Sequence, residues 1–539
     1  MSEYSDMHPG FLLLACVLLS VCIARQPTAH NFAVNSNAGS SREQYSVPIE
    51  LQPNNGNLRD FKAISSHGRE EHNEITTPSI KSIVLRFIYL IWIFLPTFLT
   101  SLFAYMSSAF RDMIWYNLLT NSMANSGAAF VKWSQWASTR PDVFPEKLCS
   151  VLSKLQANAP IHSYAYTKYL IEKELKTPIN LVFNEFNVEP IASGSIAQVY
   201  KAKLNNIEVA VKVRHPNVKE NIELDFIIMK VVARYIESIP GLEWLHLSDS
   251  LTQFSATISS QTSLDVEGKH LVLFNRNFRN WKNTKFPKPY ILTDSVLVES
   301  WETGVSVAKY ATKNHKNKDY YNIGHFVVTR GEDIYLKMLL QDNLMHADLH
   351  PGNILVNINS NQQPESIVLV DAGMVAELKL IERQNFIGLL EAMGEGKGDE
   401  AARYVIGFSQ NNLNHKNKDK FIREMKILFA ETCKGYDTNV SLGNVLRGIL
   451  TLVRQNQITI DANYATLVMN ALCLDGMAGS LSPTYNVLDG AKSLLRLHRV
   501  FKRLPGEVSN IVMKLFLPIA LKLKGKYDKK VIRNINMHN

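Results

Sequence analysis

The sequence predicts a mixed α+β fold on three observations. Short runs rich in β-branched residues, around 191–213 and 291–299, are typical of strands. Apolar residues recur every three to four positions from 111 to 175, at 333–341 and over most of the chain after 378, which indicates helices. The chain has 539 residues, 46% of them hydrophobic and 20% charged, so it can bury a sizeable core. This composition excludes a disordered chain and a transporter with many spans.

Net charge and cysteine content further limit the class of protein and the partners that it could bind. The net charge of +9 is compatible with a nucleic acid, an anionic membrane surface or a phosphate-bearing ligand. Basic residues are spread along the chain without an interleaved aromatic platform, which argues against nucleic acid as a partner. The five cysteines form no CxxC pair, which excludes a zinc ribbon or a disulfide framework.

The N-terminal segment, 1–81, is expected to hold a targeting signal and a flexible tether. Its apolar run at 11–24 has the length of a secretory signal core, but Glu3 and Asp6 precede it and no Lys or Arg does. A mitochondrial presequence would need Arg-rich periodicity, which is missing too, so the nature of the signal stays open. From 26 to 81 the composition turns to Asn, Ser, Gly, Glu and Pro, as in tethers.

One transmembrane helix is predicted over 82–110. Residues 87–106 carry no charge and would span about 30 Å as a helix, which matches the hydrocarbon thickness of a bilayer. Lys81, Arg86 and Arg111 flank this segment, and Trp92 and Tyr105 lie in it. The alternative is a buried core helix of a large domain.

Two further expectations concern polar segments. Residues 491–539 alternate Leu, Val and Ile with Lys and Arg and predict basic amphipathic helices, either at a membrane surface or with a solvated cationic face. The Asn- and Lys-rich stretches 314–322 and 411–420 are predicted to be surface loops.

Two motifs in the central region are typical of phosphate binding. Small side chains between two expected strands let backbone N–H groups approach phosphates. A lysine ends the strand Val209-Ala-Val-Lys212, where its ammonium can pair with α- and β-phosphates, although strand lysines are usually just solvated. The candidate loop residues are Ala192, Ser193, Gly194, Ser195, Ala197 and Val199.

Two later motifs supply carboxylates. In 345–356, Asp348 and Asn353 stand five apart before an apolar strand, a spacing that suits one carboxylate orienting an attacking hydroxyl or water and one amide oxygen reaching a metal ion. Asp371 follows an apolar strand and precedes a turn, as a magnesium ligand requires. His346 and His350 do not read as a zinc site, because Pro351 and Gly352 oppose a helix and no third N or S ligand is near.

In this order and spacing, the four motifs describe a protein-kinase-like nucleotide site. The acidic partner of Lys212 should lie on a helix that comes, in the sequence, after the lysine and before the loop that carries Asp348 and Asn353. Glu267 is the candidate for that partner, and an exposed helix acid is the alternative interpretation.

These residues resemble the UbiB/ABC1 (aarF-domain) family of atypical kinases, most closely a mitochondrial branch of it, over about 128–483. Residues 131–142 are similar to the Lys-x-Gly-Gln helix of that family, and 261–278 to its Glu-rich helix. The resemblance implies a two-lobed protein-kinase-like fold at 181–490 with a helical extension at 111–180. It also implies ATP with Mg²⁺ and a role with lipid or quinone intermediates and coenzyme Q biosynthesis proteins at the inner mitochondrial membrane.

Carried over residue by residue, the resemblance assigns Lys212 to the phosphates, Glu267 to the pair with Lys212 and Asp348 to the catalytic loop. Asn353 and Asp371 become metal ligands. Lys132 and Gln135 belong to the extension helix that covers the nucleotide side.

This chain departs from the family pattern at several positions. Ser134 replaces a glycine, Gly194 an alanine, Leu349 a proline and Ala372 a phenylalanine, and Gln261 and Ser263 replace two acids. No Ala-Pro-Glu or long activation segment follows Asp371, which argues against ordinary protein phosphorylation.

Two functions therefore remain open. The first is an ATP- and Mg²⁺-dependent ATPase or small-molecule or lipid kinase. The second is a catalytically weak pseudokinase that acts as a nucleotide-sensing scaffold or a lipid-binding subunit of a biosynthetic complex.

Overall fold

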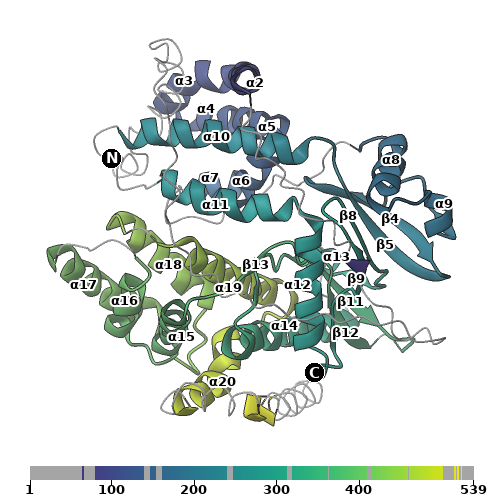
Figure 1. Cartoon of the computed structure of the whole chain (residues 1–539). Helices are drawn as coiled ribbons and strands as arrows, with labels where there is room; N and C mark the ends of the chain where they lie inside the picture. The colour runs from purple at the N-terminus through teal and green to yellow at the C-terminus, as the bar shows by residue number, and fades with distance from the viewer. Residues whose placement is uncertain are drawn as a thin grey trace.

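The computed structural model describes residues 64–65, 79–138, 146–152, 161–238, 247–311, 318–361, 363–409, 415–458, 460–501, 515–517, 519–520 and 524. In this part of the chain, one region is built on a β-sheet and a second is mostly helical (Figure 1). The chain is thus mixed helix and sheet, as expected. The signal, most of the tether and most of the chain after 501 lie outside the described residues.

The larger sheet follows the order β1-β7-β8-β5-β4-β2, with β3 paired to β4. β4 and β5 are joined by Asn205 and Asn206, which both have positive φ, as a two-residue hairpin turn requires. The strands are β1 (Ile64–Ser65), β2 (Glu185–Phe186), β3 (Ala192–Ser193), β4 (Ala197–Leu204), β5 (Ile207–Arg214), β7 (Pro289–Leu292) and β8 (Val296–Ser300).

The two faces of this sheet have different roles. Val209, Val211 and Val213 of β5 pack with β8 valines against α8 (Tyr164–Leu175) and α9 (Ile179–Val182). Because strand side chains alternate, Lys212 of β5 points to the opposite face. Glu299 of β8 shares that face, since Lys212 pairs with Leu297 and Ala210 pairs with Glu299 in the register. This second face is covered by α12 (Leu264–Asn277).

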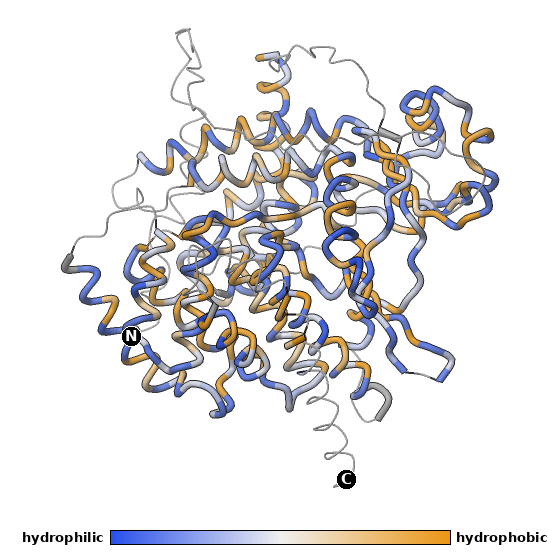
Figure 2. Tube along the Cα trace, turned by 60° about the horizontal axis from the view of Figure 1, so that its bottom comes forward, coloured by the Kyte–Doolittle hydropathy of each residue, from blue (hydrophilic) through white to orange (hydrophobic). Residues whose placement is uncertain are grey.

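The helical region surrounds a small four-stranded sheet in the order β6-β12-β11-β9 and a short β10–β13 pairing. Apolar and polar positions alternate along most of its helices (Figure 2), and their apolar sides form one continuous core. The helices are α13 (Ala308–Ala311), α14 (Lys318–Lys337), α15 (Leu380–Gly394), α16 (Gly398–Ile406), α17 (His415–Thr432), α18 (Leu442–Gln455), α19 (Ala462–Leu481) and α20 (Val487–Phe501). The strands are β6 (Thr284–Lys285), β9 (Val305–Ser306), β10 (Met345–His346), β11 (Ile354–Ile358), β12 (Pro364–Leu369) and β13 (Val375–Ala376).

The N-terminal helices lie on α10 (Val218–Glu237), beside α11 (Leu247–Gln261), in Figure 1. The segment expected as one helix over 82–110 is instead divided. Ser107 is extended, and its side chain accepts a hydrogen bond from the N–H of Phe110, so it begins a new helix. The helices are α2 (Ile80–Leu99), α3 (Ser101–Met106), α4 (Ser108–Phe110), α5 (Tyr116–Asn125), α6 (Ala128–Ser138) and α7 (Glu146–Leu152), with a π-helical turn, Arg111–Trp115, before α5.

Parts of the two predicted loops are helical. α14 begins at Lys318 and α17 at His415, so 318–322 and 415–420 are not loops. In α17, Phe421, Met425 and Phe429 recur every four residues and are buried, and this face holds the preceding polar turn in the helix. Asn417, Asp419 and Lys420 of this turn are exposed, so the polar composition is compatible with a helix whose other side is buried, because intrinsic propensity is a weak guide.

One basic residue of the C-terminal segment is neither solvated nor positioned for a membrane. Lys524 is buried and pairs with Glu332 at 2.9 Å and with Asp333 at 3.0 Å, both on α14. The expectation for 491–539 is therefore wrong for Lys524. The helix in this segment also starts earlier than expected, at Val487.

Candidate nucleotide site

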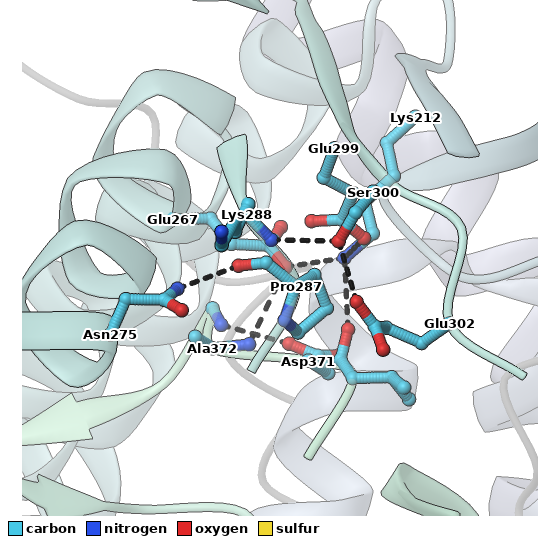
Figure 3. Close-up of polar contacts among 12 residues, drawn as sticks. Lys212, Glu267, Asn275, Pro287, Lys288, Glu299, Ser300, Glu302, Asp371 and Ala372 are labelled. Carbon is cyan, nitrogen blue, oxygen red and sulfur yellow. Dashed lines mark hydrogen bonds and ion pairs between the residues drawn. The ribbon is translucent and has the colours of Figure 1, made fainter. Parts of the chain in front are cut away.

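Four charged side chains meet between the sheet and α12 (Figure 3). The Lys212 ammonium lies 2.5 Å from Glu267 Oε1 and 3.1 Å from Glu299 Oε1, and it donates to the carbonyl of Val370 at 3.2 Å. Val370 directly precedes Asp371, so one lysine joins β5, α12, β8 and the turn after β12. Burial opposes the charged lysine, but Glu267, Glu299 and Asp371 outweigh it and raise its pKa.

Glu299 was not predicted as a site residue. It is 3% exposed, and its Oε2 has no hydrogen-bond partner among the described residues. Burial raises the pKa of Glu299 to about 8, although the nearby Lys212 opposes the shift. An acid inside the apolar run Val296-Leu-Val-Glu299 was the available signal, because a strand carboxylate in such a run must face a polar partner.

The turn after β12 presents Asp371. Its Oδ1 accepts from the N–H of Gly373 at 2.8 Å, and Ala372 N–H donates to Glu267 at 3.4 Å. Burial would raise the pKa of Asp371, but Lys212 and then Lys132 lower it below its usual value. The carboxylate is therefore held ionised, as a metal ligand must be.

The catalytic-loop candidates lie beside this turn. His346 donates through Nε2 to the carbonyl of Asp371, and its Nδ1 accepts from the N–H of Asp348 at 3.2 Å. Asn353 Nδ2 donates to Asp348 Oδ2 at 3.1 Å. The amide oxygen of Asn353 is therefore not the atom that faces Asp348. The two segments are thus fixed to one another, and His346 serves as their connection rather than as a metal ligand.

α19 supports the catalytic loop from behind. Asn470 Nδ2 donates to the carbonyl of His346 at 2.7 Å, and Cys473 Sγ donates to that of Leu349 at 3.0 Å. Sequence reasoning missed both residues, because an Asn and a Cys in an apolar helix give no specific signal. Both are positioning residues for the loop that carries Asp348.

The loop of small residues forms the β3–β4 hairpin, in which Ala192 pairs with Val199. The N–H of Gly194 donates to the carbonyl of Ala197 at 2.9 Å, and its φ is not positive. A Cβ there would lie 3.4 Å from that carbonyl, an ordinary contact, so the backbone does not require glycine. Ser195 is buried in the same hairpin.

The extension helix α6 and this loop share one apolar cluster. Trp133 and Trp136 of α6 and Ile196 of the loop all pack against buried apolar residues of α10 and α11. Lys132 is close enough to lower the pKa of Asp371, while Gln135 is partly exposed on the same helix. Ser134 is buried, and its hydroxyl donates to the carbonyl of Phe130, so it fills the place of the glycine without disturbing the helix.

The family pattern has acidic residues at positions 261 and 263, and this chain has Gln261 and Ser263 there. The surrounding residues form a different hydrogen-bond network. Ser263 donates to Asp294 at 2.6 Å, and Asp294 pairs with Arg214 at 2.6 Å. Arg214 also donates to the carbonyl of Thr262, whereas Nε2 of the buried Gln261 has no hydrogen-bond partner in the part of the chain that the structure describes. The end of β5 is thus tied to the start of α12 by Arg214 and Asp294.

A histidine pair, in which His215 is buried and His162 is partly buried, holds the loop to β5 and α8. His215 Nε2 bonds the carbonyl of Gly194 at 2.9 Å, and its Nδ1 lies 2.7 Å from Nδ1 of His162. Burial, and then the neighbouring His215, lower the pKa of His162 to about 4; burial also lowers that of His215. Because the two rings share a hydrogen bond between their Nδ1 atoms, only one of these two nitrogens can carry a proton.

This pair predicts a pH dependence of stability. The folded pKa of His162 is below its unfolded value, so the folded chain binds fewer protons than the unfolded chain between about pH 4 and pH 6.5. The contribution of His162 to the free energy of unfolding is therefore fully present above pH 6.5 and is lost as the pH falls toward 4. The melting temperature of the wild type should drop more between pH 7 and 5 than that of His162→Gln, and parallel curves would contradict this assignment.

Within the described residues, no group of three or more His, Cys, Asp or Glu side chains could hold a metal ion alone. Asp371 and the amide oxygen of Asn353 still fit Mg²⁺, because this ion commonly takes one or two protein oxygens and completes its shell with phosphates and water.

Comparison with known proteins gives the family. Residues 154–405 match the model of the ABC1 atypical kinase-like domain. The "Probable serine/threonine-protein kinase abkC" of Dictyostelium discoideum is 31% identical over 88% of this chain and 76% of its own length. The chain belongs to the UbiB/ABC1 family of atypical kinase-like proteins, and the resemblance seen in the sequence is confirmed at this level.

Two further relatives have informative names. A mitochondrial ABC1 family protein of Saccharomyces cerevisiae is 29% identical over 77% of this chain and 74% of its own length. The "Probable protein kinase UbiB" of Vibrio cholerae is 27% identical over 68% of each chain. A solved structure, Rv3197 with erythromycin from Mycobacterium tuberculosis, covers 66% of this chain and 91% of its own at a TM-score of 0.41 and 19% identity, too weak a similarity for any argument about ligands.

Proposed function

We propose that this chain binds ATP with Mg²⁺ between its sheet and its catalytic loop, and acts as an ATPase or as a small-molecule or lipid kinase. The observation that carries the proposal is the contact of Lys212 with both Glu267 and the carbonyl before Asp371. This arrangement brings a phosphate-binding cation beside a metal-binding carboxylate. Mg²⁺ would neutralise charge on the phosphates, with Asn353 and Asp371 as its protein ligands.

The biological setting is part of the same proposal. Similarity to UbiB and to mitochondrial ABC1 proteins supports a role in coenzyme Q biosynthesis or mitochondrial lipid metabolism. The acceptor would be a lipid or quinone intermediate and the location a mitochondrial membrane, with coenzyme Q biosynthesis proteins as partners. The apolar helix α2, with the shorter α3, supports attachment to a membrane.

Replacing Asp371 with Asn is expected to abolish the Mg²⁺-dependent part of nucleotide binding, because the carboxylate supplies the charge that holds the metal. The measurement is titration of the full chain with a fluorescent ATP analogue, with Mg²⁺ and with EDTA. Asp399→Asn, at a surface pair with Arg403, is the matched control and should bind like the wild type. Unchanged Mg²⁺-dependent binding in the Asp371 variant would reject the site.

Replacing Asp348 with Asn separates the enzyme from the scaffold. The scaffold alternative has a specific basis, because Gln261 and Ser263 lack the acids of the family pattern. If the chain turns over ATP, Asp348→Asn should bind nucleotide but lose hydrolysis about a hundredfold or more, and should not restore quinone levels in cells lacking the protein. Full rescue by this variant would favour the pseudokinase scaffold.

A further inference from the structure

The outward side of α2 and α3 is apolar along its whole length. The stretch Ile80–Met106 has 27 residues and a mean hydropathy of 2.0 in its most apolar window, of which only 11% is buried. No charged residue occurs between Arg86 and Arg111. A continuous exposed surface of this kind marks an interaction site. Its most exposed members are Ile80, Trp92, Leu99, Leu102, Phe103 and Met106.

The inward side of α2 is hydrogen-bonded to the segment 115–125, which runs antiparallel to it. In the middle of α2, Tyr89 donates to the carbonyl of Asn125 at 3.2 Å. Further along, Ser122 donates to the carbonyl of Ile93 at 3.0 Å. Near its end, Trp115 donates to the carbonyl of Thr97 at 2.9 Å. The two segments are thus joined at successive turns.

The inward side is also fixed to α10. Arg86 makes two bonds to Asp225, at 2.8 and 2.9 Å, and this carboxylate is 1% exposed. Leu90 packs with Phe130 of α6 and Ile228 of α10. Breaking the ion pair would leave a buried charge without its partner, so α2 is bound firmly to the folded domain.

These contacts are incompatible with a helix that crosses a bilayer. α5 would enter the hydrocarbon beside α2, and its exposed face carries Asn117, Asn121 and Asn125, one per turn. The amide groups of Asn117 and Asn125 donate to backbone carbonyls nearby, but lipid offers no donor to an amide oxygen, so these side chains would be costly in hydrocarbon. A spanning α2 would therefore have to lose α5 and the Arg86–Asp225 pair.

We propose that α2 and α3 lie in the plane of one membrane leaflet, with their outward side in the acyl chains and the rest of the described chain on a single side of the membrane. This inference rests on the membrane attachment of the proposed function. It replaces the spanning helix that the sequence predicts for 82–110.

The chemistry of the surface favours lipid over a protein partner. A protein interface has a polar rim, which this uncharged stretch does not provide. The exposed rings of Trp92 and Tyr105 are amphipathic side chains typical of the membrane interface. Lys81 is exposed at one end, and Arg111 lies near the other, where cations can approach anionic headgroups.

A labelling experiment tests the orientation. Single cysteines replace Ser82, Ser108 and Asp399, each in the full chain without its native cysteines. Sealed membranes from expressing cells are then treated with a maleimide that does not cross membranes, before and after detergent. All three positions are expected to react alike. Opposite accessibility of positions 82 and 108 would show a span and overturn the proposal.

Vesicle binding tests whether lipid covers the exposed side of α2 and α3. Ile88→Glu and Phe103→Glu place a charge on the exposed side and should each weaken binding of the full chain to phosphatidylcholine–cardiolipin vesicles by about tenfold or more. Asn121→Glu on α5 is the matched control and should bind like the wild type. A wild type that ignores vesicles, or Glu variants that still bind them, would reject a lipid occupant.

The outcome of the vesicle-binding test can be distinguished from the outcome of the nucleotide-binding test. Ile88 and Phe103 are more than half exposed and lie outside the site, so both variants should keep the melting temperature and nucleotide affinity of the wild type. Loss of vesicle binding with nucleotide binding intact supports the membrane inference alone. Normal vesicle binding in a chain that binds no nucleotide would reject only the proposed catalytic function.

Discussion

Lys212→Met is expected to abolish nucleotide binding and also to destabilise the fold. The lysine is buried among Glu267, Glu299 and Asp371, so its removal leaves carboxylates without a cation. Removing one partner of a buried ion pair typically costs about 3–5 kcal/mol. The measurements are the free energy of unfolding from denaturant titration and the affinity for an ATP analogue.

A second substitution separates the two effects. Lys212→Met with Glu299→Leu removes one of the buried carboxylates along with the lysine, so stability should recover in part while nucleotide binding should not. The double-mutant cycle measures the coupling between the two residues. If Lys212→Met unfolds at the same denaturant concentration as the wild type, the buried pairing of Lys212 with these carboxyl groups is wrong.

Gly324→Ala should be among the most destabilising substitutions outside the site. Gly324 lies on α14, and a Cβ at this position would come within 2.2 Å of the carbonyl oxygen of Leu481, which is backbone of α19 and cannot rotate away. The helices must then separate, at a cost of about 1–3 kcal/mol or more. Thermal unfolding of the full chain measures this loss.

Gly479→Ala supplies the control, because no atom lies within 4 Å of the Cβ that it adds on α19. Alanine in a helix is about 1 kcal/mol more favourable than glycine, so this variant should be as stable as the wild type or slightly more stable. If both alanine variants melt like the wild type, the close approach of α14 and α19 is not present in solution.

Local signals in the sequence account for the strands, most helices and the order of the site motifs. Spacing indicated Lys212, Asp348, Asn353 and Asp371, because each stands at the end of an apolar strand or in the turn beside one. Glu267 was the weakest of these assignments, and the structure brings it to Lys212 across 55 residues of sequence. The roles of these residues in binding and catalysis stay predictions.

Long-range pairing explains what the sequence could not show. Glu299 lies beside Lys212 only through the register of β5 with β8, and several registers would satisfy the same apolar pattern. The contact of His162 with His215 likewise depends on how α8 packs on the sheet. For 80–106, hydropathy is equally high for a spanning helix and for one that is fixed to a domain on one side, so hydropathy alone could not separate them.

The hydrogen bonds from α19 to the loop that carries Asp348 limit how far this chain can be shortened without changing that loop. The ABC1 match ends at residue 405, but Asn470 and Cys473, which hold the loop, come 65 and more residues later. A protein cut to the matched region would also lack α6, whose tryptophans complete the apolar cluster on which Ile196 of the β3–β4 hairpin packs. Expression boundaries drawn from the family match would thus produce a fragment in which the β3–β4 hairpin and the loop that carries Asp348 have both lost residues that support them.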